Sequence, residues 1–170
     1  NHLIHACRRN IGITAILYNN NIYGMTGGQY SPTTPKYDKG TTAPYGNIDK
    51  AFDICNLAAS AGATYVGRAT AYHANLVTSL VQNALNNDGF SLIEAISVCP
   101  TYYGRKNKKG SAVDMMEWQK NNAVNISAAS KLSPEALEGK FLIGELKNSP
   151  EPEYTNEYQK IIDRLKKESQ

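Results

Sequence analysis

Three consecutive asparagines follow an apolar run near the start of the chain, and glycines follow the asparagines. The apolar run spans residues 13–18, the asparagines are Asn19, Asn20 and Asn21, and a Gly-Gly pair stands at 27–28. Such a run predicts a buried parallel strand, and open α/β sheets bind ligands beyond the carboxyl ends of their strands. Amide oxygens suit Mg²⁺, which keeps phosphate oxygens among its ligands, and glycine lets the backbone approach those phosphates. A ligand-free asparagine turn has the same composition, because asparagine tolerates left-handed backbone and bonds its own main chain.

The three cysteines of the chain differ in their setting. Cys99 ends a second apolar run, 90–98, and precedes proline, a pairing also found at the last ligand of ferredoxin-type cluster motifs. A single cysteine is more often a small buried hydrophobe than a ligand, and from the residues alone this second reading is favoured. Cys7 and Cys55 fall on the apolar faces of predicted helices, and we expect them in the core.

The histidines offer little chemistry. His2 and His5 stand three residues apart on a predicted helix, which would place two imidazoles on one face, but no third ligand is evident. A helix surface or a subunit contact is the expected role. His73 lies between a predicted strand and a predicted helix, and we expect it to serve the structure.

The elements that must position these residues alternate along the chain. A helix ends near residue 10, strands are predicted at 13–18, 64–69 and 90–98, and helices at 48–61 and 74–87. The helix residues expected to face the core are Ile48, Ala51, Phe52, Cys55 and Ala58 in the first of these two helices, and Leu76, Leu80, Val81, Ala84 and Leu85 in the second. Strand–helix–strand alternation predicts an α/β fold with a mostly parallel sheet, right-handed crossovers and flanking helices. The loop at 19–47 is unusually long, and such loops are usually functional.

The second part of the chain has a different composition. We expect a basic loop at 102–110, a helix at 112–122, a mixed polar connection at 125–139 and an edge strand at 141–146. An amphipathic helix follows at 154–167, whose expected buried residues are Tyr158, Ile161, Ile162 and Leu165.

Length and composition exclude some classes of protein. With 170 residues the chain has the size of one domain, and no apolar run reaches the ~20 residues of a membrane span. A net charge of +3 does not imply nucleic-acid binding. An odd number of cysteines and the lack of a signal-peptide pattern predict a reducing compartment, with the cytoplasm as the expected location.

Several motifs in order resemble one family. The chain looks like the beta subunit of 2-oxoacid:ferredoxin oxidoreductases, and the 2-oxoglutarate branch is most similar. The similarity covers roughly the first two-thirds of the chain. The segments that carry it are Asn20-Asn21-Ile22-Tyr23-Gly24-Met25-Thr26-Gly27-Gly28-Gln29, Ser31-Pro32-Thr33-Thr34-Pro35, Thr42-Ala43-Pro44-Tyr45-Gly46-Asn47, Gly62-Ala63-Thr64-Tyr65-Val66, Gly89-Phe90-Ser91 and Cys99-Pro100-Thr101.

The resemblance implies a thiamine diphosphate-binding fold that begins just after the family's Gly-Asp-Gly motif. Residues 1–100 would be the C-terminal portion of the cofactor domain, and 101–170 an extension that packs on the same domain, with a C-terminal edge strand and helix. By the resemblance, Asn20 and the carbonyl of Ile22 bind Mg²⁺. Gly24, Met25 and Thr26 lie against the diphosphate or the thiazolium end, and Cys99 is the fourth ligand of a 4Fe–4S cluster.

The activity implied by the resemblance is oxidative decarboxylation of a 2-oxoacid with coenzyme A, giving acyl-CoA, carbon dioxide and reduced ferredoxin. The partners would be an alpha subunit, which supplies the catalytic carboxylate, and ferredoxin, so no catalytic residue is expected here. The basic residues Arg105, Lys106, Lys108 and Lys109 would be solvated, steer ferredoxin or meet coenzyme A phosphates. Two alternatives stay open: a decarboxylase that binds thiamine diphosphate without redox chemistry, and a non-catalytic assembly module in isolation.

Overall fold

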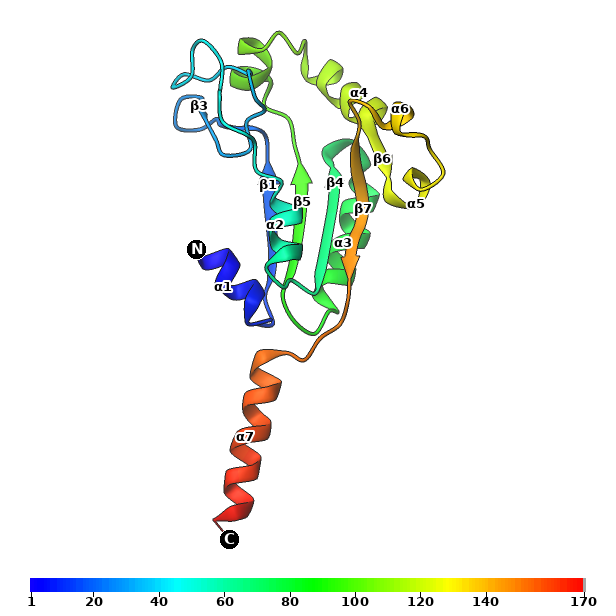
Figure 1. Ribbon diagram of the computed structural model, residues 1–170. Coiled ribbons are helices and arrows are strands. Elements are labelled where there is room, and N and C mark those ends of the chain that lie inside the picture. Colours follow the sequence, from blue (N-terminus) through cyan, green and yellow to red (C-terminus); the bar gives the residue numbers. More distant parts are fainter. Residues whose placement is uncertain (170) are drawn as a thin grey trace.

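A five-stranded sheet forms the centre of the computed structural model, which describes residues 1–169 (Figure 1). Its order is β1-β5-β4-β7-β6. Strands β1 (Thr14–Asn19), β5 (Ser91–Ile96) and β4 (Tyr65–Thr70) run parallel, β7 (Phe141–Asn148) is antiparallel to β4, and β6 (Ala123–Asn125) is parallel to β7. The predicted α/β class with a mostly parallel sheet is confirmed.

Helices cover both faces of the sheet. Helices α1 (His2–Arg8) and α2 (Ile54–Ser60) pack on one face, where their Cys7 and Cys55 join Val66 and Leu92 of the sheet in one core. Helix α3 (Ala74–Leu85) packs on the other face, where its Leu80 joins Tyr65 and Ile93. Neighbouring strand residues thus point into different cores, as the pleat requires. Strands β4 and β5 are buried on both faces, which is why they appear in the sequence as largely apolar runs. The predicted burial of the strand at 13–18 is wrong for one face: β1 lies at the edge of the sheet, and Ile16 and Tyr18 are 43% and 76% exposed.

The helix predicted at 48–61 is shorter than expected. It begins at Ile54, and Ile48 and Phe52, both expected inside, are 80% and 57% exposed. Asn47 accepts a hydrogen bond from the Asp49 amide at 3.0 Å, and Asp53 caps α2 by accepting one from the Asn56 amide at 3.1 Å. Short polar side chains that bond nearby backbone compete with helix formation, which explains the late start. Leu85, at the end of α3, is also exposed and was expected inside.

The connection after α4 (Ala112–Asn122) is more regular than the sequence indicates. It contains β6, α5 (Ile126–Ala129) and α6 (Pro134–Leu137), none of which is predicted. Strand β7 was expected at the sheet edge, and this is wrong, because β6 pairs with its outer side. The division at residue 100 stays a prediction; β6 and β7 extend the sheet of the first part.

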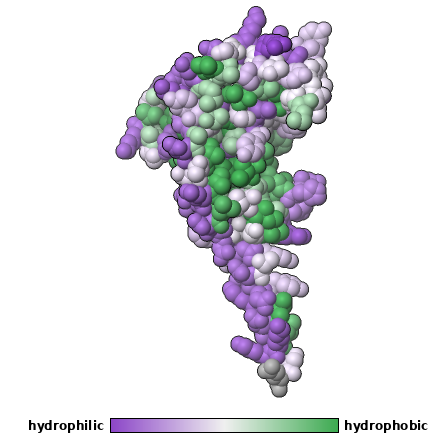
Figure 2. Space-filling view, turned by 180° about the vertical axis from the view of Figure 1, so that it is seen from behind, coloured by the Kyte–Doolittle hydropathy of each residue, from purple (hydrophilic) through white to green (hydrophobic). Residues whose placement is uncertain are grey.

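The last helix, α7 (Tyr154–Glu168), forms as predicted but projects away from the body (Figure 1). Its Tyr158, Ile161 and Leu165 are exposed and Ile162 is half-buried, so their predicted burial is wrong. An amphipathic pattern indicates an apolar face without indicating what covers it. Figure 2 shows apolar atoms among the polar ones along this helix. Among the described residues, no helix has both the length and the apolar character needed to cross a membrane.

Candidate cofactor site

The carboxyl ends of β1 and β5 lie side by side, and the predicted site residues leave the sheet there. Asn19 and Ile96 are register partners, and the Ser97 amide donates to the Asn19 carbonyl at 2.8 Å. The asparagine loop follows β1, and Cys99 and the short helical segment η2 (Pro100–Gly104) follow β5. Parallel pairing therefore brings two segments together that stand about 80 residues apart in the chain.

The three asparagines build a tight turn from their own side chains. Asn19 Oδ1 accepts a hydrogen bond from the Asn21 amide at 3.0 Å, and Asn20 Oδ1 accepts one from the Ile22 amide at 3.2 Å. Asn21 has a φ of 61°, a left-handed conformation that asparagine tolerates. The turn expected from composition alone is thus present, and the half-buried Asn20 side chain lies at the carboxyl edge of the sheet.

A small hairpin follows the turn and carries the glycines. It pairs β2 (Ile22–Tyr23) with β3 (Gln29–Tyr30). Gly28 has a φ of 83°, and a Cβ there would lie 2.6 Å from Tyr102 Cδ1, so only glycine allows η2 to pack on the hairpin. At the hairpin tip, Met25 and Thr26 are exposed, and the Thr26 hydroxyl donates to Gln29 Oε1 at 2.7 Å.

Gly24 lies between Asn20 and Cys99. A Cβ on Gly24 would be 3.3 Å from Cys99 Sγ and 4.0 Å from Asn20 Nδ2. Cys99 is half-buried and packs against the cluster of Ile22, Tyr103 and Met115. The structure therefore brings Asn20, Ile22, Gly24 and Cys99 together, whereas Met25 and Thr26 face solvent.

The other two cysteines and the histidines lie where they were expected. Cys7 of α1 and Cys55 of α2 are buried in the core between these helices and the sheet. His2 and His5 are exposed on α1. His73 Nδ1 lies 2.8 Å from the Thr70 hydroxyl, and burial lowers the pKa of this imidazole. These contacts fit structural roles.

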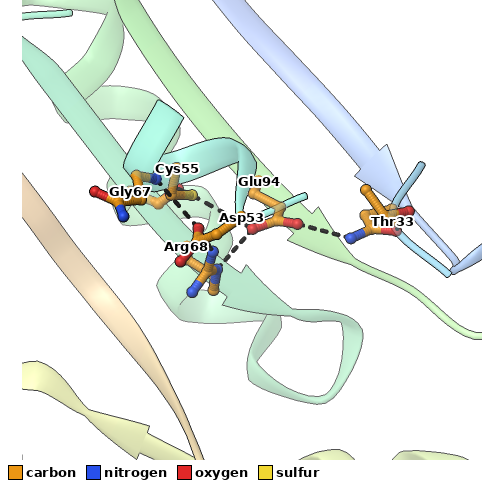
Figure 3. Close-up of polar contacts among 8 residues, drawn as sticks. Thr33, Asp53, Cys55, Gly67, Arg68 and Glu94 are labelled. Atoms are coloured by element: carbon orange, nitrogen blue, oxygen red, sulfur yellow. Dashed lines mark hydrogen bonds and ion pairs between the residues drawn. The ribbon is translucent and has the colours of Figure 1, made fainter. Parts of the chain in front are cut away.

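A buried ionic network next to the site has no counterpart in the predictions. Glu94 of β5 is 3% exposed, and its Oε2 accepts from Arg68 Nε at 2.6 Å. The other arm of Arg68 reaches Asp53 Oδ1, also at 2.6 Å (Figure 3). The sequence held one signal for this network: Glu94 is a carboxylate inside a strand that is predicted to be buried, and a buried charge needs a partner.

Two pKa shifts follow from this network. Burial raises the pKa of Asp53, but the Asn56 amide and the Arg68 guanidinium outweigh it and hold the pKa below its usual range. Burial raises the pKa of the Cys55 thiol far above its usual range. Cys55 is therefore a neutral donor, and it lies 3.3 Å from Glu94 Oε2.

A cavity of about 530 Å³ lies on the side of the turn that faces α4. Its lining includes Asn21, Val98, Tyr103, Lys109 and Trp118. Asp38 accepts a hydrogen bond from the Tyr103 hydroxyl and lies 3.6 Å from Lys109 Nζ. Burial, and next the hydrogen bond to Asp38, raise the pKa of Tyr103 above its usual range. Of the basic residues, only Lys108 and Lys109 line this cavity; Arg105 and Lys106 are exposed outside it.

The donor set at the turn fits part of a Mg²⁺–diphosphate site. The Asn20 amide oxygen and the Ile22 carbonyl are hard oxygen donors of the kind that Mg²⁺ takes alongside phosphate and water. The bare Gly24 backbone next to Asn20 leaves the room that a Cβ would fill. Among the described residues, no three His, Cys, Asp or Glu side chains lie close enough together to hold a metal. The turn therefore offers oxygen donors that fit part of such a centre.

Comparison with known proteins finds relatives over most of the chain. The family model "Thiamine pyrophosphate enzyme, C-terminal TPP binding domain" matches residues 1–95. The 2-oxoglutarate synthase subunit KorB of Methanocaldococcus jannaschii is 48% identical over 99% of this chain and 62% of its own length. The subunit of the same name from Methanothermobacter marburgensis is 52% identical over 90% of this chain and 54% of its own length.

A solved structure matches the fold of nearly the whole chain. It is a 2-oxoglutarate:ferredoxin oxidoreductase from Magnetococcus marinus with 2-oxoglutarate, coenzyme A and succinyl-CoA bound. The TM-score is 0.80 at 29% identity, over 96% of this chain and 56% of that one. The chain thus spans less than two-thirds of the length of each of these three proteins.

Proposed function

We propose that this chain is part of the beta subunit of a 2-oxoglutarate:ferredoxin oxidoreductase. The premise is that the chain belongs to the family of thiamine pyrophosphate enzymes, whose C-terminal TPP binding domain it matches. The whole protein would convert 2-oxoglutarate and coenzyme A into succinyl-CoA and carbon dioxide and pass the electrons to ferredoxin. The solved relative, with 2-oxoglutarate, coenzyme A and succinyl-CoA bound, supports this substrate and this product.

The observation that carries the proposal is the meeting of Asn20, Gly24 and Cys99 at the carboxyl edge of the sheet. When bound, thiamine diphosphate supplies the electron sink for decarboxylation, and the protein contributes binding, orientation and electrostatics. Asn20 Oδ1 and the Ile22 carbonyl would donate oxygen ligands to Mg²⁺. Gly24, Met25 and Thr26 would lie along the cofactor.

Cys99 would ligate a 4Fe–4S cluster next to this site. Its sulfur lies against Gly24 and is shielded by an apolar cluster, a setting that suits a buried cluster near the cofactor. This position favours the redox enzyme over a thiamine diphosphate-dependent decarboxylase without redox chemistry. Because Cys7 and Cys55 are buried in the core, the other three cysteine ligands would come from outside residues 1–170.

The protein would work as a hetero-oligomer. The partners would be an alpha subunit, which supplies the carboxylate that activates the cofactor, and a ferredoxin. Exposed Arg105, Lys106, Lys108 and Lys109 at the η2 end would attract an acidic ferredoxin or coenzyme A phosphates. The three unpaired cysteines support a cytoplasmic location.

The test is a pair of substitutions at Asn20 in the full-length complex. Asn20→Ala removes the oxygen ligand, and we expect most of the affinity for Mg²⁺–thiamine diphosphate to be lost in isothermal titration calorimetry. Asn20→Asp keeps an oxygen at this position and should retain binding. Asn86→Ala, on an exposed asparagine outside the site, is the control. Unchanged affinity in Asn20→Ala would remove Asn20 from the metal site.

A further inference from the structure

The buried carboxylate of Glu94 holds the asparagine turn by a direct hydrogen bond. Its Oε1 accepts a hydrogen bond from Asn19 Nδ2 at 2.7 Å, while its Oε2 accepts hydrogen bonds from Arg68 Nε and from the Cys55 thiol. Figure 3 shows Glu94 on β5 between Arg68 and the end of β1 near Thr33. The two oxygens thus have separate partners, one toward the core and one toward the site.

Glu94 determines which way the Asn19 amide faces. An ionised carboxylate can only accept, so the amide nitrogen of Asn19 must point toward Glu94 and the amide oxygen away from it. That oxygen accepts from the Asn21 amide at 3.0 Å and from the Thr33 hydroxyl at 2.8 Å. A flipped Asn19 amide would place an NH₂ group against these two donors and lose both hydrogen bonds.

The effect reaches the residues that would bind metal. Asn20 lies between Asn19 and Asn21, whose amide is bonded to the Asn19 side-chain oxygen. The side-chain oxygen of Asn20 accepts a hydrogen bond from the Ile22 amide at 3.2 Å. Thr34, next to Thr33, donates to the Asn21 carbonyl at 2.6 Å, so the returning loop holds the same turn from its other side. Displacing the Asn19 amide would therefore move the Asn20 side chain and the Ile22 carbonyl together.

We propose that Glu94 is a positioning residue for the cofactor metal: through the Asn19 amide it fixes the turn that presents Asn20 and Ile22 to Mg²⁺. This inference rests on the proposed function. Glu94 does not touch the cofactor itself. Its role is to orient a turn whose side chains are otherwise free to bond the backbone in more than one way.

The test measures Mg²⁺ affinity at saturating thiamine diphosphate in the full-length complex stripped of cofactor. Glu94→Gln keeps the size of the side chain and lets its amide NH₂ face Asn19. We expect Mg²⁺ binding about tenfold weaker or more, since partners that orient metal ligands typically matter at this level. The apparent KM for Mg²⁺ should rise, and kcat should recover at high Mg²⁺.

A double-mutant cycle with Asn19→Ala separates positioning from general damage. If Glu94 acts through Asn19, Glu94→Gln should weaken Mg²⁺ binding little further in the Asn19→Ala background. Additive losses would overturn the proposal, and so would Mg²⁺ affinity equal to wild type in Glu94→Gln. Where Glu94→Gln fails to fold, Asn19→Ala, which leaves Glu94 paired with Arg68, tests whether the Asn19 amide holds the turn at all. Mg²⁺ affinity equal to wild type in Asn19→Ala would then overturn the proposal.

Asp53→Asn is the matched control. Asp53 bonds the far arm of Arg68, and its side chain is 55% exposed. Asparagine keeps the cap of α2 and removes one charge from the network. We expect Mg²⁺ affinity to stay at the wild-type level, and a loss equal to that of Glu94→Gln would show a general effect of the network and overturn the assignment. Wild-type complex that binds no thiamine diphosphate at all would instead refute the proposed function.

Discussion

Single residues at the end of β1 combine a local and a distant role. The side-chain oxygens of Asn19 and Asn20 each accept a hydrogen bond from a nearby backbone amide. Each residue also lies next to a distant segment: Asn19 contacts Glu94 of β5, and Asn20 lies across Gly24 from Cys99. The alternatives that the composition left open, a structural turn and a ligand turn, are therefore compatible. Asn20 has a second lone pair on the same oxygen, which a metal can share.

Cys99 gives a residue-scale prediction. In the full-length complex, we expect Cys99→Ser to change the electron paramagnetic resonance signal of one reduced 4Fe–4S cluster, because serine oxygen is a poorer ligand for this iron than thiolate. Cys7→Ala is the control, since Cys7 of α1 is fully buried in a core cluster that does not include Cys99. A Cys99→Ser spectrum identical to that of wild type would show that Cys99 does not ligate the cluster and is a core residue.

At the scale of elements, the segment before α7 is tied to the start of the sheet. Glu153 caps α7 by accepting from the Asn156 amide at 2.8 Å, and its Oε1 accepts from the Gly12 amide at 3.0 Å. Asn10 donates to the carbonyls of Glu151 and Pro152, at 3.1 and 3.0 Å. These bonds hold the root of α7 although the helix itself leaves the body.

Glu153 makes this junction sensitive to acid. The Thr155 hydroxyl, the Thr155 and Asn156 amides and, more weakly, the Gly12 amide bond its carboxylate and lower its pKa from 4.5 to about 2. A depressed pKa means that the carboxylate stabilises the fold fully above the unfolded value near 4.5 and stops doing so as the pH falls toward 2.

We expect Glu153→Gln to remove part of this pH dependence. The free energy of unfolding, measured with urea between pH 5 and 2.5, should fall less steeply with acid in the variant than in wild type. Glu157→Gln, on an exposed glutamate one turn further along α7, is the control. Equal slopes for wild type and Glu153→Gln would contradict the assignment.

At the scale of the whole molecule, this chain would supply only part of each proposed centre: two oxygen donors for Mg²⁺ and one of the four cysteines for the 4Fe–4S cluster. The family relationship and the fold predicted from the motifs are confirmed, and the chain spans about 62% or less of the three relatives described above. Among the described residues, the asparagine turn offers Mg²⁺ amide and carbonyl oxygens without a cluster of acidic ligands. An anionic ligand supplies much of the attraction for this ion.

The isolated 170-residue chain should therefore bind Mg²⁺–thiamine diphosphate poorly. Calorimetry on this chain should give little or no heat of binding at cofactor concentrations that saturate the full-length complex. The full-length complex, measured in parallel, is the positive control. Micromolar affinity in the isolated chain would show that residues 1–170 complete the site by themselves.

Much of the fold is determined locally and can be predicted from the sequence. The strands at 64–69 and 90–98 appear as largely apolar runs because both of their faces are buried, and the asparagine turn is encoded by side chains that bond their own backbone. The apolar run at 13–18 also predicts its strand, but Ile16 and Tyr18 are exposed because β1 lies at the edge of the sheet. The helix predicted at 48–61 is too long for a similar local reason. Its apolar periodicity extends back to Ile48, but the short polar side chains of Asn47 and Asp53 bond nearby backbone and delay the start of the helix to Ile54.

Only the tertiary structure decides what lies against these local pieces. Sheet order places β5 between β1 and β4, and this alone brings Glu94 to Asn19 and Arg68, and Cys99 to Gly24. The same limit applies to α7, whose apolar stripe is evident in the sequence but is left uncovered by the body. Short-range backbone preferences act over a few residues, whereas contacts between distant segments depend on which strands become neighbours, and no local pattern encodes that choice.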